Sequence, residues 1–336
     1  MNKILDNTVT NGTNLFLGDY SGFQRYDNPI YPQISKLEQV MRGNYWNPEE
    51  ISCRTDHRDF FELPASVQDT MIMIWFYQTM MDSTQNRGIE LTLNTIVSNP
   101  ECEALLKTWS YFELIHSISY SHIIQSIFPN SKNIFDNLIG DKTIEDRLKT
   151  ELTSYAQFNS NNATMDEVVE LFVTIYMLEG IKFYVSFLMT YVTQDKYQSI
   201  PGATRIIRLI NHDEDLHTLA SEMILKIIRK ESKYNDDALY VKLVNEKLNQ
   251  VYMDEYKFAS LIFSRNIQPI EFSVVEDFLN YYKSERFNRL MGNGVETEKP
   301  EIVKWFELQK DLNSIRVNQQ ESDMSVYNIG VLEDDF

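Results

Sequence analysis

Residues 109–122 read Trp-Ser-Tyr-Phe-Glu-Leu-Ile-His-Ser-Ile-Ser-Tyr-Ser-His, and this stretch decides the fold. It contains no Gly or Pro, which favours one continuous helix. Glu113 and His116 are three residues apart, so their side chains share one face of that helix. Tyr120 follows one turn later on the same face. The stretch therefore predicts half of a metal site with an oxidisable phenol beside it.

A second pair with the same spacing lies further along the chain, at Glu214 and His217. One such pair alone is more often a solvated helix face, but two pairs in apolar helices favour a metal site. Asp82 and Glu179 strengthen this interpretation, because each lies in a strongly apolar segment where an ionised carboxylate needs a partner. Four carboxylates and two imidazoles from four helices are typical of a dinuclear site in a ferritin-like four-helix bundle. The ligand types indicate iron or manganese.

The rest of the chain also favours helices. It has 11 Gly and 9 Pro in 336 residues, with no strand-like alternation and no internal repeat. Four long apolar segments predict the bundle helices, at residues 66–87, 100–128, 165–193 and 203–229. A weaker helix is predicted at 143–158 and two or three more between 236 and 292, and Asn47 with Pro48 predicts a further helix start. The predicted fold class is all-α, a ferritin-like bundle core with additional helices.

Composition and charge exclude several classes of function. Lys plus Arg is 31 and Asp plus Glu is 49, so the net charge of −18 argues against broad contact with nucleic acid or an anionic membrane. Cys53 and Cys102 form no metal-binding or disulfide pattern, which indicates a reducing compartment, and we predict a cytoplasmic protein. Residues 171–192 are apolar enough to cross a membrane. Glu179 and Lys182 near their middle would each cost about 2.5–3.5 kcal/mol in lipid, so a buried core helix is the better interpretation.

Three regions follow from the composition. Residues 1–34 are rich in Asn, Thr, Gly and Tyr and predict an irregular arm. Residues 35–312 hold the predicted helices and form one domain. Residues 313–336 have few large apolar groups, which predicts a flexible C-terminal tail.

Several stretches match one known family in type and order. They are Tyr-Trp-Asn-Pro-Glu-Glu at 45–50, Gln-Thr-Met-Met-Asp-Ser at 78–83, Glu-Leu-Ile-His-Ser-Ile-Ser-Tyr-Ser-His at 113–122, Leu-Glu-Gly-Ile-Lys-Phe-Tyr-Val-Ser-Phe at 178–187 and Asp-Glu-Asp-Leu-His at 213–217. On these motifs the chain resembles the small, radical-generating beta subunit of class I ribonucleotide reductase along nearly its whole length. The resemblance implies that the chain makes a radical and a large catalytic subunit reduces ribonucleoside diphosphates. The lack of a Gly-rich phosphate loop agrees with that division.

The resemblance also implies a ligand set for two iron ions per chain, with a manganese pair as the alternative. The ligands would be Asp82, Glu113 and His116 for the ion nearer the tyrosine, and Glu179, Glu214 and His217 for the other, with Glu113 as a bridge. Tyr120 would carry the stable radical, inside an apolar shield formed by Phe183, Phe187 and Ile210.

A transfer route is implied as well. Trp46 and Asp213 would start it, with Asp213 linking Trp46 to His116. Tyr327 would relay the radical across the subunit gap, and the last residues would dock on the large subunit. A homodimer is expected from the family.

Two alternatives share part of this pattern. An R2-like ligand-binding oxidase with a mixed manganese and iron centre has the same ligand geometry and needs no relay tail. A metal-storage or purely structural bundle needs neither a buried phenol after the ligand histidine nor a relay tyrosine. The joint presence of Tyr120, Trp46, Asp213 and Tyr327 opposes both alternatives.

Overall fold

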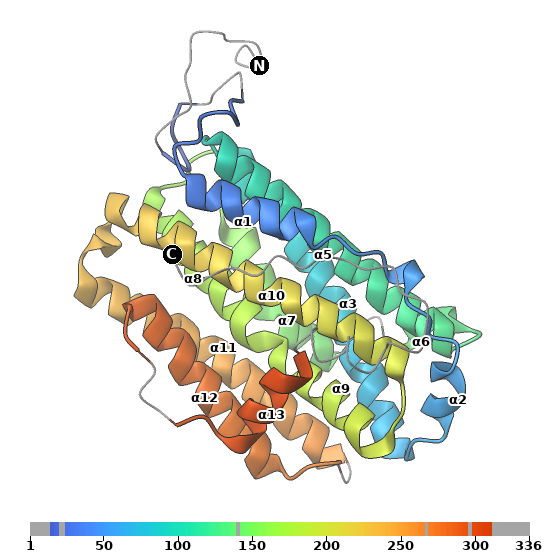
Figure 1. Ribbon diagram of the computed structural model, residues 1–336. Coiled ribbons are helices and arrows are strands. Elements are labelled where there is room, and N and C mark those ends of the chain that lie inside the picture. The colour runs from blue at the N-terminus through green and yellow to red at the C-terminus, as the bar shows by residue number, and fades with distance from the viewer. Residues whose placement is uncertain (1–13, 20–23, 139–141, 266–267, 295–297, 311–336) are drawn as a thin grey trace.

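The computed structural model describes residues 14–19, 24–138, 142–265, 268–294 and 298–310. Within these ranges the chain is helical almost throughout (Figure 1), and extended backbone pairs only at a single bridge between Phe16 and Val97. The α-helices are α1 (Pro32–Gly43), α2 (Asp56–Phe61), α3 (Ala65–Leu91), α4 (Leu93–Ile96), α5 (Pro100–Ile127), α6 (Ser131–Leu138), α7 (Lys142–Gln157), α8 (Met165–Met177), α9 (Tyr184–Tyr197), α10 (Pro201–Ile228), α11 (Asp237–Arg265), α12 (Phe272–Met291) and α13 (Glu301–Lys310). The all-α prediction is confirmed.

The four predicted bundle helices are present. They correspond to α3, α5, α8 continued by α9, and α10, and the weaker predicted helix corresponds to α7. Helices α3 and α5 pack along each other, α8 packs on α10, and α1 lies against α5 and α10 (Figure 1). The predicted start of α5 is also confirmed, because Asn99 Oδ1 accepts a hydrogen bond from Cys102 N at 2.9 Å and Pro100 occupies the first turn.

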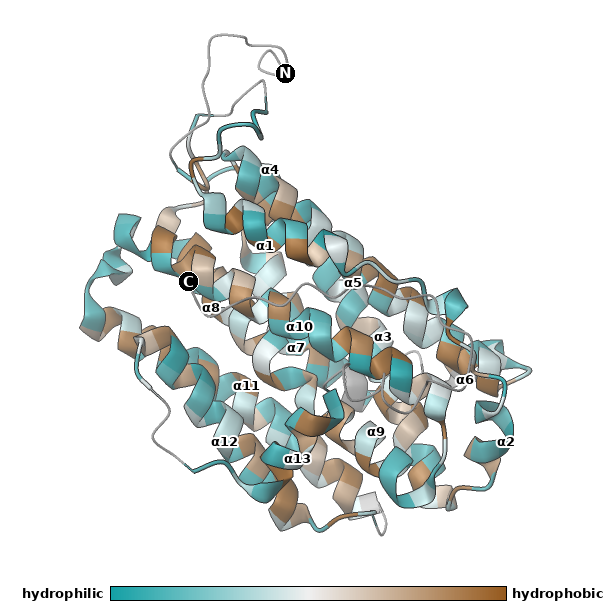
Figure 2. Cartoon of the chain, in the orientation of Figure 1, coloured by the Kyte–Doolittle hydropathy of each residue, from teal (hydrophilic) through white to brown (hydrophobic). Residues whose placement is uncertain are grey.

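The predicted buried core helix lies at the centre of the bundle. The span Met165–Tyr197 is long and apolar enough to cross a membrane, but it is buried inside the protein. Its apolar residues appear in brown along α8 and α9 in Figure 2, while outer helices such as α12 carry teal residues as well. The prediction of a core helix over a membrane span is confirmed.

The prediction of one unbroken helix over residues 165–193 is wrong in one detail. A π-helical turn, Leu178–Lys182, separates α8 from α9, and Glu179 lies inside it. Such a turn inserts an extra residue into the helix and is often found at functional sites. The local sequence gives no sign of this turn, because the groups that stabilise it come from other helices.

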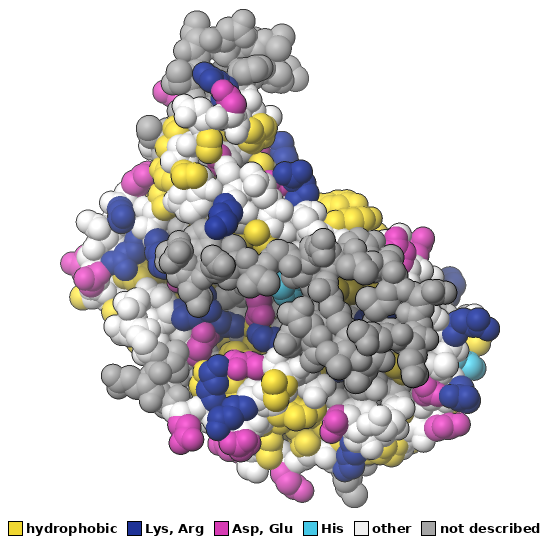
Figure 3. Space-filling view, viewed as in Figure 1, with side chains coloured by type: hydrophobic (Ala, Val, Ile, Leu, Met, Phe, Trp, Pro, Cys, Tyr) yellow, Lys and Arg dark blue, Asp and Glu magenta, His cyan; other side chains and the backbone are white. Residues whose placement is uncertain are grey.

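Other differences lie at the edges of the bundle. The helix predicted to start at Asn47 is a single 3₁₀ turn, Pro48–Glu50, although Asn47 caps it by accepting from Glu49 N at 3.1 Å. Helices α1, α2, α4, α6 and α13 were not predicted, and α1 begins at Pro32, just inside the predicted arm. Residues 311–336, which include Tyr327, lie outside the described residues. On the face shown in Figure 3, acidic and basic side chains are interspersed over the described surface.

Candidate metal centre

The structure brings all six predicted ligand residues together in the middle of the bundle. Every one of them is fully buried: Asp82 on α3, Glu113 and His116 on α5, Glu179 in the π-helical turn, and Glu214 and His217 on α10. They form two groups, each with ligand atoms within 4.8 Å of one another: Asp82, Glu113 and His116 in one, and Glu113, Glu179, Glu214 and His217 in the other. Glu113 belongs to both groups, which is the geometry of a bridging ligand.

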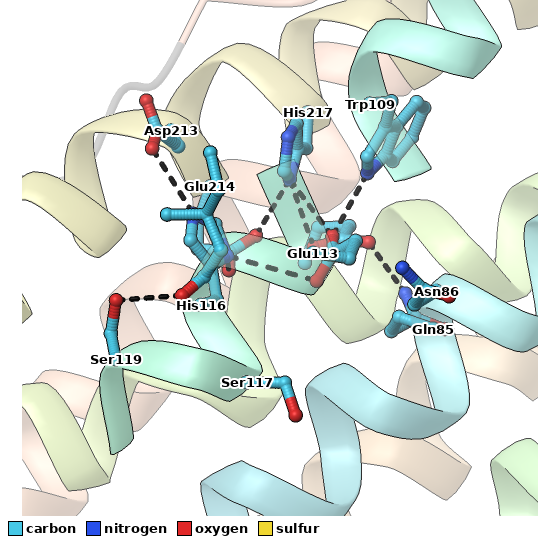
Figure 4. Close-up of polar contacts among 12 residues, drawn as sticks. Gln85, Asn86, Trp109, Glu113, His116, Ser117, Ser119, Asp213, Glu214 and His217 are labelled. Carbon is cyan, nitrogen blue, oxygen red and sulfur yellow. Dashed lines mark hydrogen bonds and ion pairs between the residues drawn. The ribbon is translucent and has the colours of Figure 1, made fainter. Parts of the chain in front are cut away.

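Both imidazoles turn their Nδ1 atoms toward carboxylate oxygens (Figure 4). His217 Nδ1 lies 3.0 Å from Glu214 Oε2, 3.1 Å from Glu113 Oε1 and 3.7 Å from Glu179 Oε2. His116 Nδ1 lies 3.2 Å from Glu214 Oε1 and 3.7 Å from Glu113 Oε2. The donor atoms of four helices therefore converge on a small volume.

The free oxygens of this cluster fit a pair of hard cations. Both oxygens of Asp82, and one oxygen each of Glu113, Glu179 and Glu214, make no hydrogen bond to the described residues although they are buried. Buried polar atoms without partners are uncommon and costly. Four carboxylates with two imidazoles are the donor set that iron and manganese accept. The chemistry of the donor set thus fits a dinuclear metal site.

The pKa values of the cluster reflect crowded negative charge. Burial raises the pKa of Asp82 and that of Glu214 well above the usual range, and neighbouring carboxylates raise both further. Burial also raises the pKa of Glu113, but hydrogen bonds from the two histidines outweigh it and lower that pKa to about 2. The carboxylates in turn raise the pKa of His217 well above its usual value against the effect of burial. Cations bound here would relieve this repulsion.

Residues around the ligands hold them in place. Trp109 Nε1 donates to Glu113 Oε1 at 3.0 Å, and the Trp109 ring stacks on His217 with centroids 4.9 Å apart. Gln85 Nε2 donates to Glu179 Oε1 at 2.5 Å, and the Tyr155 hydroxyl donates to Gln85 Oε1 at 2.7 Å. Sequence reasoning gave none of these three residues a role. Helical spacing could have found two of them, because Trp109 lies four residues before Glu113 and Gln85 lies three after Asp82.

Tyr120 is fully buried on α5, one turn beyond His116. Its hydroxyl makes no hydrogen bond to the described residues. Burial, followed by the charges of Asp82 and Glu214, raises the pKa of the phenol well above its usual value, so the phenol is held protonated. The three predicted shield residues, Phe183, Phe187 and Ile210, are also fully buried, and the two Phe rings stack 5.9 Å apart.

A hydrogen-bonded line runs from the cluster to Trp46. Trp46 Nε1 donates to Asp213 Oδ2 at 2.8 Å, and His116 Nε2 lies 3.1 Å from the same oxygen. Burial lowers the pKa of His116, but Asp213 and Glu113 outweigh it and raise that pKa to about 10. The Nε2–H of His116 therefore points at Asp213 while Nδ1 faces the cluster. The predicted link from Trp46 through Asp213 to His116 is present in the structure, whereas Tyr327 lies outside the described residues.

Comparison with known sequences gives one family. The sequence profile described as "Ribonucleotide reductase, small chain" matches residues 25–294. The chain is 28% identical over 348 residues to the "Ribonucleoside-diphosphate reductase subunit beta" of Buchnera aphidicola subsp. Schizaphis graminum, covering 95% of this chain and 92% of that protein. It is 26% identical over 351 residues to "Ribonucleoside-diphosphate reductase 1 subunit beta" of Escherichia coli O157:H7, with the same coverage of 95% and 92%.

Solved structures share the fold. The ribonucleotide reductase R2 subunit from Clostridium botulinum superposes with a TM-score of 0.83 at 20% identity, covering 91% of this chain and 97% of that one. The dimanganese(II) form of NrdF from Streptococcus sanguinis superposes with a TM-score of 0.72 at 18% identity, covering 87% and 99%. At these identities the likeness shows a common fold.

Proposed function

Because the family profile covers most of the chain, the protein belongs to the ribonucleotide reductase small-chain family, and we propose that its buried cluster serves to place and keep a radical on Tyr120. The chain is the small subunit of a ribonucleoside-diphosphate reductase. One observation carries the proposal for the site. A buried phenol without a hydrogen-bond partner among the described residues lies on α5, the helix that contributes Glu113 and His116 to a carboxylate–histidine cluster with free buried oxygens.

The proposed ligands are Asp82, Glu113 and His116 for one metal ion and Glu179, Glu214 and His217 for the other, with Glu113 shared. We propose two iron ions per chain. A manganese pair is the alternative, since the structural relative from Streptococcus sanguinis is a dimanganese(II) protein. After reaction with an oxidant such as oxygen, such a bound pair would supply the one-electron oxidising power that a phenol requires.

The side chains of this protein then keep and guide the radical. Tyr120 is protonated and buried, so its oxidation removes both an electron and a proton inside a dry core. The apolar side chains of Phe183, Phe187 and Ile210 are proposed to keep water and reductants away from it. Trp46, Asp213 and His116 form the proposed route outward, because their hydrogen bonds join the cluster to an indole that can be oxidised. This route favours the reductase over the oxidase alternative.

The nucleotide chemistry is proposed to take place on a large catalytic subunit in the cytoplasm. Both cysteines of this chain are buried, and burial raises the pKa of the Cys53 thiol to about 12 and that of Cys102 further. Neither thiol is therefore available as a reactive thiolate at neutral pH. We propose that the partner supplies the thiols for ribonucleoside diphosphate reduction, and that no nucleic acid or membrane is involved.

A homodimer is also proposed. Tyr111, Leu114 and Ile118 form a stripe along α5, and each is more than two fifths exposed, at 48%, 43% and 47%. Their spacing of three and four residues places them on one face of a core helix. A stripe of large apolar groups on the helix that carries two ligands supports an interface with a second copy of the chain.

The test of the proposed function is an electron paramagnetic resonance spectrum of the full chain loaded with ferrous iron and exposed to air. We expect a stable organic radical signal, because the phenoxyl radical of a buried tyrosine is shielded from water and reductants. Metal content should be measured on the same sample. Full iron loading without any radical would contradict the proposed role of Tyr120 but would not contradict the proposed metal site.

Glu214→Ala is expected to reduce the metal content below two ions per chain. The variant removes an oxygen that lies 3.2 Å from His116 Nδ1 and another 3.0 Å from His217 Nδ1. Glu222→Ala on the same helix is the matched control, because that buried carboxylate pairs with Arg289 and Lys226 instead. Elemental analysis after desalting makes the comparison. Two ions retained by the Glu214 variant would remove it from the ligand set.

Two changes in the C-terminal residues are expected to separate radical storage from transfer. Tyr327→Phe should keep the radical on Tyr120 and the binding of the large subunit but abolish turnover, since phenylalanine is much harder to oxidise.

Ending the chain after Gly330 should keep the radical and weaken association, because Val331, Leu332 and Phe336 are the apolar residues at the end. About 20 extended residues reach on the order of 70 Å, enough to cross a subunit boundary. Normal association and turnover of the shortened chain would refute the docking role.

A further inference from the structure

The π-helical turn Leu178–Lys182 presents Glu179 to the cluster, and its backbone needs outside support. A π-helical turn is rare because it carries an extra residue and breaks the regular ladder of helix hydrogen bonds. All five of its residues are buried, so water does not replace the bonds that it loses. Carbonyl groups in such a place need donors from elsewhere in the protein.

Arg286 on α12 supplies one donor. Its Nε donates to Gly180 O at 3.0 Å, and its Nη2 donates to the Tyr184 hydroxyl at 2.6 Å, just beyond the turn. The residue is 4% exposed, and Glu285 accepts from its third nitrogen at 2.8 Å. A Cβ atom on Gly180 would lie 2.6 Å from Arg286 Nε, so this close approach requires glycine at position 180.

Arg147 on α7 supplies the other donor. Its Nη2 donates to Lys182 O at 3.1 Å and to Glu255 Oε2 at 2.5 Å. The guanidinium is held between the rings of Tyr77 and Phe258, with 3.3 and 3.2 Å from its central carbon to the ring centroids. In return, Lys182 Nζ donates to Arg147 O at 2.6 Å. Two carbonyls of one turn are thus fixed by arginines from two different helices.

The carboxylate of Glu179 is fixed separately. Gln85 donates to Oε1, whereas Oε2 makes no hydrogen bond to the described residues and lies 3.7 Å from His217 Nδ1. Gln85 therefore sets the direction of the side chain and leaves Oε2 turned toward the cluster. The side chain can keep this direction only if its backbone stays in place, which is what the two arginines secure.

We propose that Arg147 and Arg286 are positioning residues for Glu179, which hold the π-helical turn so that this carboxylate reaches the metal site. The inference rests on the proposed function, because it takes Glu179 as a ligand. It predicts an unequal effect on the two metal ions. Loosening the turn should weaken binding of the ion held with Glu179 and leave binding of the ion held by Asp82, Glu113 and His116 unchanged.

The experiment is a titration of the full chain with manganese(II), followed by electron paramagnetic resonance, which separates a lone ion from a coupled pair. Arg286→Gln is expected to lower the affinity for the second ion, the one held with Glu179, about 10- to 100-fold, as loss of a group supporting a ligand commonly does. Arg286→Lys should recover part of the loss, because a lysine can donate to Gly180 O without reaching all the partners of the guanidinium. Hydrogen exchange of the amides around residues 178–184 should be faster in Arg286→Gln.

Arg289→Gln is the matched control, one turn along the same helix, where the arginine pairs with Glu222. If Arg286→Gln does not fold, Gly180→Ala is the second variant, because its methyl group pushes Arg286 away from the turn. Gly180→Ala should also weaken binding of the second ion. Equal weakening of both ions, or unchanged affinity in Arg286→Gln or in its substitute Gly180→Ala, would overturn the positioning role. Glu179→Ala separates this failure from that of the proposed function. If Glu179→Ala keeps both ions, the ligand set itself is wrong.

Discussion

Tyr120→Phe is expected to keep two metal ions per chain and to lose both the radical signal and turnover. The variant removes a phenol oxygen that makes no hydrogen bond to the described residues, so no partner is left unpaired. Its free energy of unfolding should therefore stay within about 1 kcal/mol of the original protein. Phenylalanine fills the same space but cannot be oxidised to a stable radical, and the loss of activity should be complete.

The matched control is Tyr77→Phe. Tyr77 is also fully buried, and its hydroxyl likewise has no hydrogen-bond partner in the described part of the chain, but it faces Arg147 and Phe258. Spectra of both variants after iron loading in air, with turnover assayed beside the large subunit, make the comparison. A radical of unchanged line shape in Tyr120→Phe would show that another of the 19 tyrosines holds it.

The parts of the site that could be predicted from the sequence are those that helix geometry controls. The spacing of Glu113 and His116, repeated at Glu214 and His217, places each pair on one helix face whatever the surrounding fold. The apolar character of α3 and α8 predicted burial, and buried carboxylates need partners, so Asp82 could be added from residue type alone. The convergence of these groups follows from packing four such helices together.

The parts that could not be predicted depend on contacts between distant segments. Arg147 and Arg286 stabilise the π-helical turn from α7 and α12, and no local pattern around Glu179 shows it. Tyr155 reaches Gln85 from α7 in the same way. Helix α13 is short and adjoins a polar stretch of sequence, so composition alone does not predict it. In the structure its Val303 and Phe306 are buried.

Asp213→Ala is expected to abolish turnover and also to disturb the metal site. The change leaves Trp46 Nε1 and His116 Nε2 without their common acceptor, at a cost of about 1–3 kcal/mol for each buried group left unpaired. Loss of the carboxylate that bonds to the second nitrogen of a histidine ligand commonly weakens metal binding about 10- to 100-fold. Loss of activity in this variant therefore has two causes, and metal content must be measured together with turnover.

Trp46→Phe separates the two causes. It removes the indole but keeps the contact of Asp213 with His116, so metal content and the Tyr120 radical should match the original protein while turnover is lost. The indole ring lies 6.3 Å from the His116 ring and is 5% exposed, so phenylalanine leaves a small void and a modest loss of stability. Trp305→Phe on α13, where the indole is half-buried, is the control for loss of a tryptophan. Turnover that survives in Trp46→Phe with a normal radical would mean that the radical leaves the cluster by another path, and Asp213 would then be a support for His116 alone.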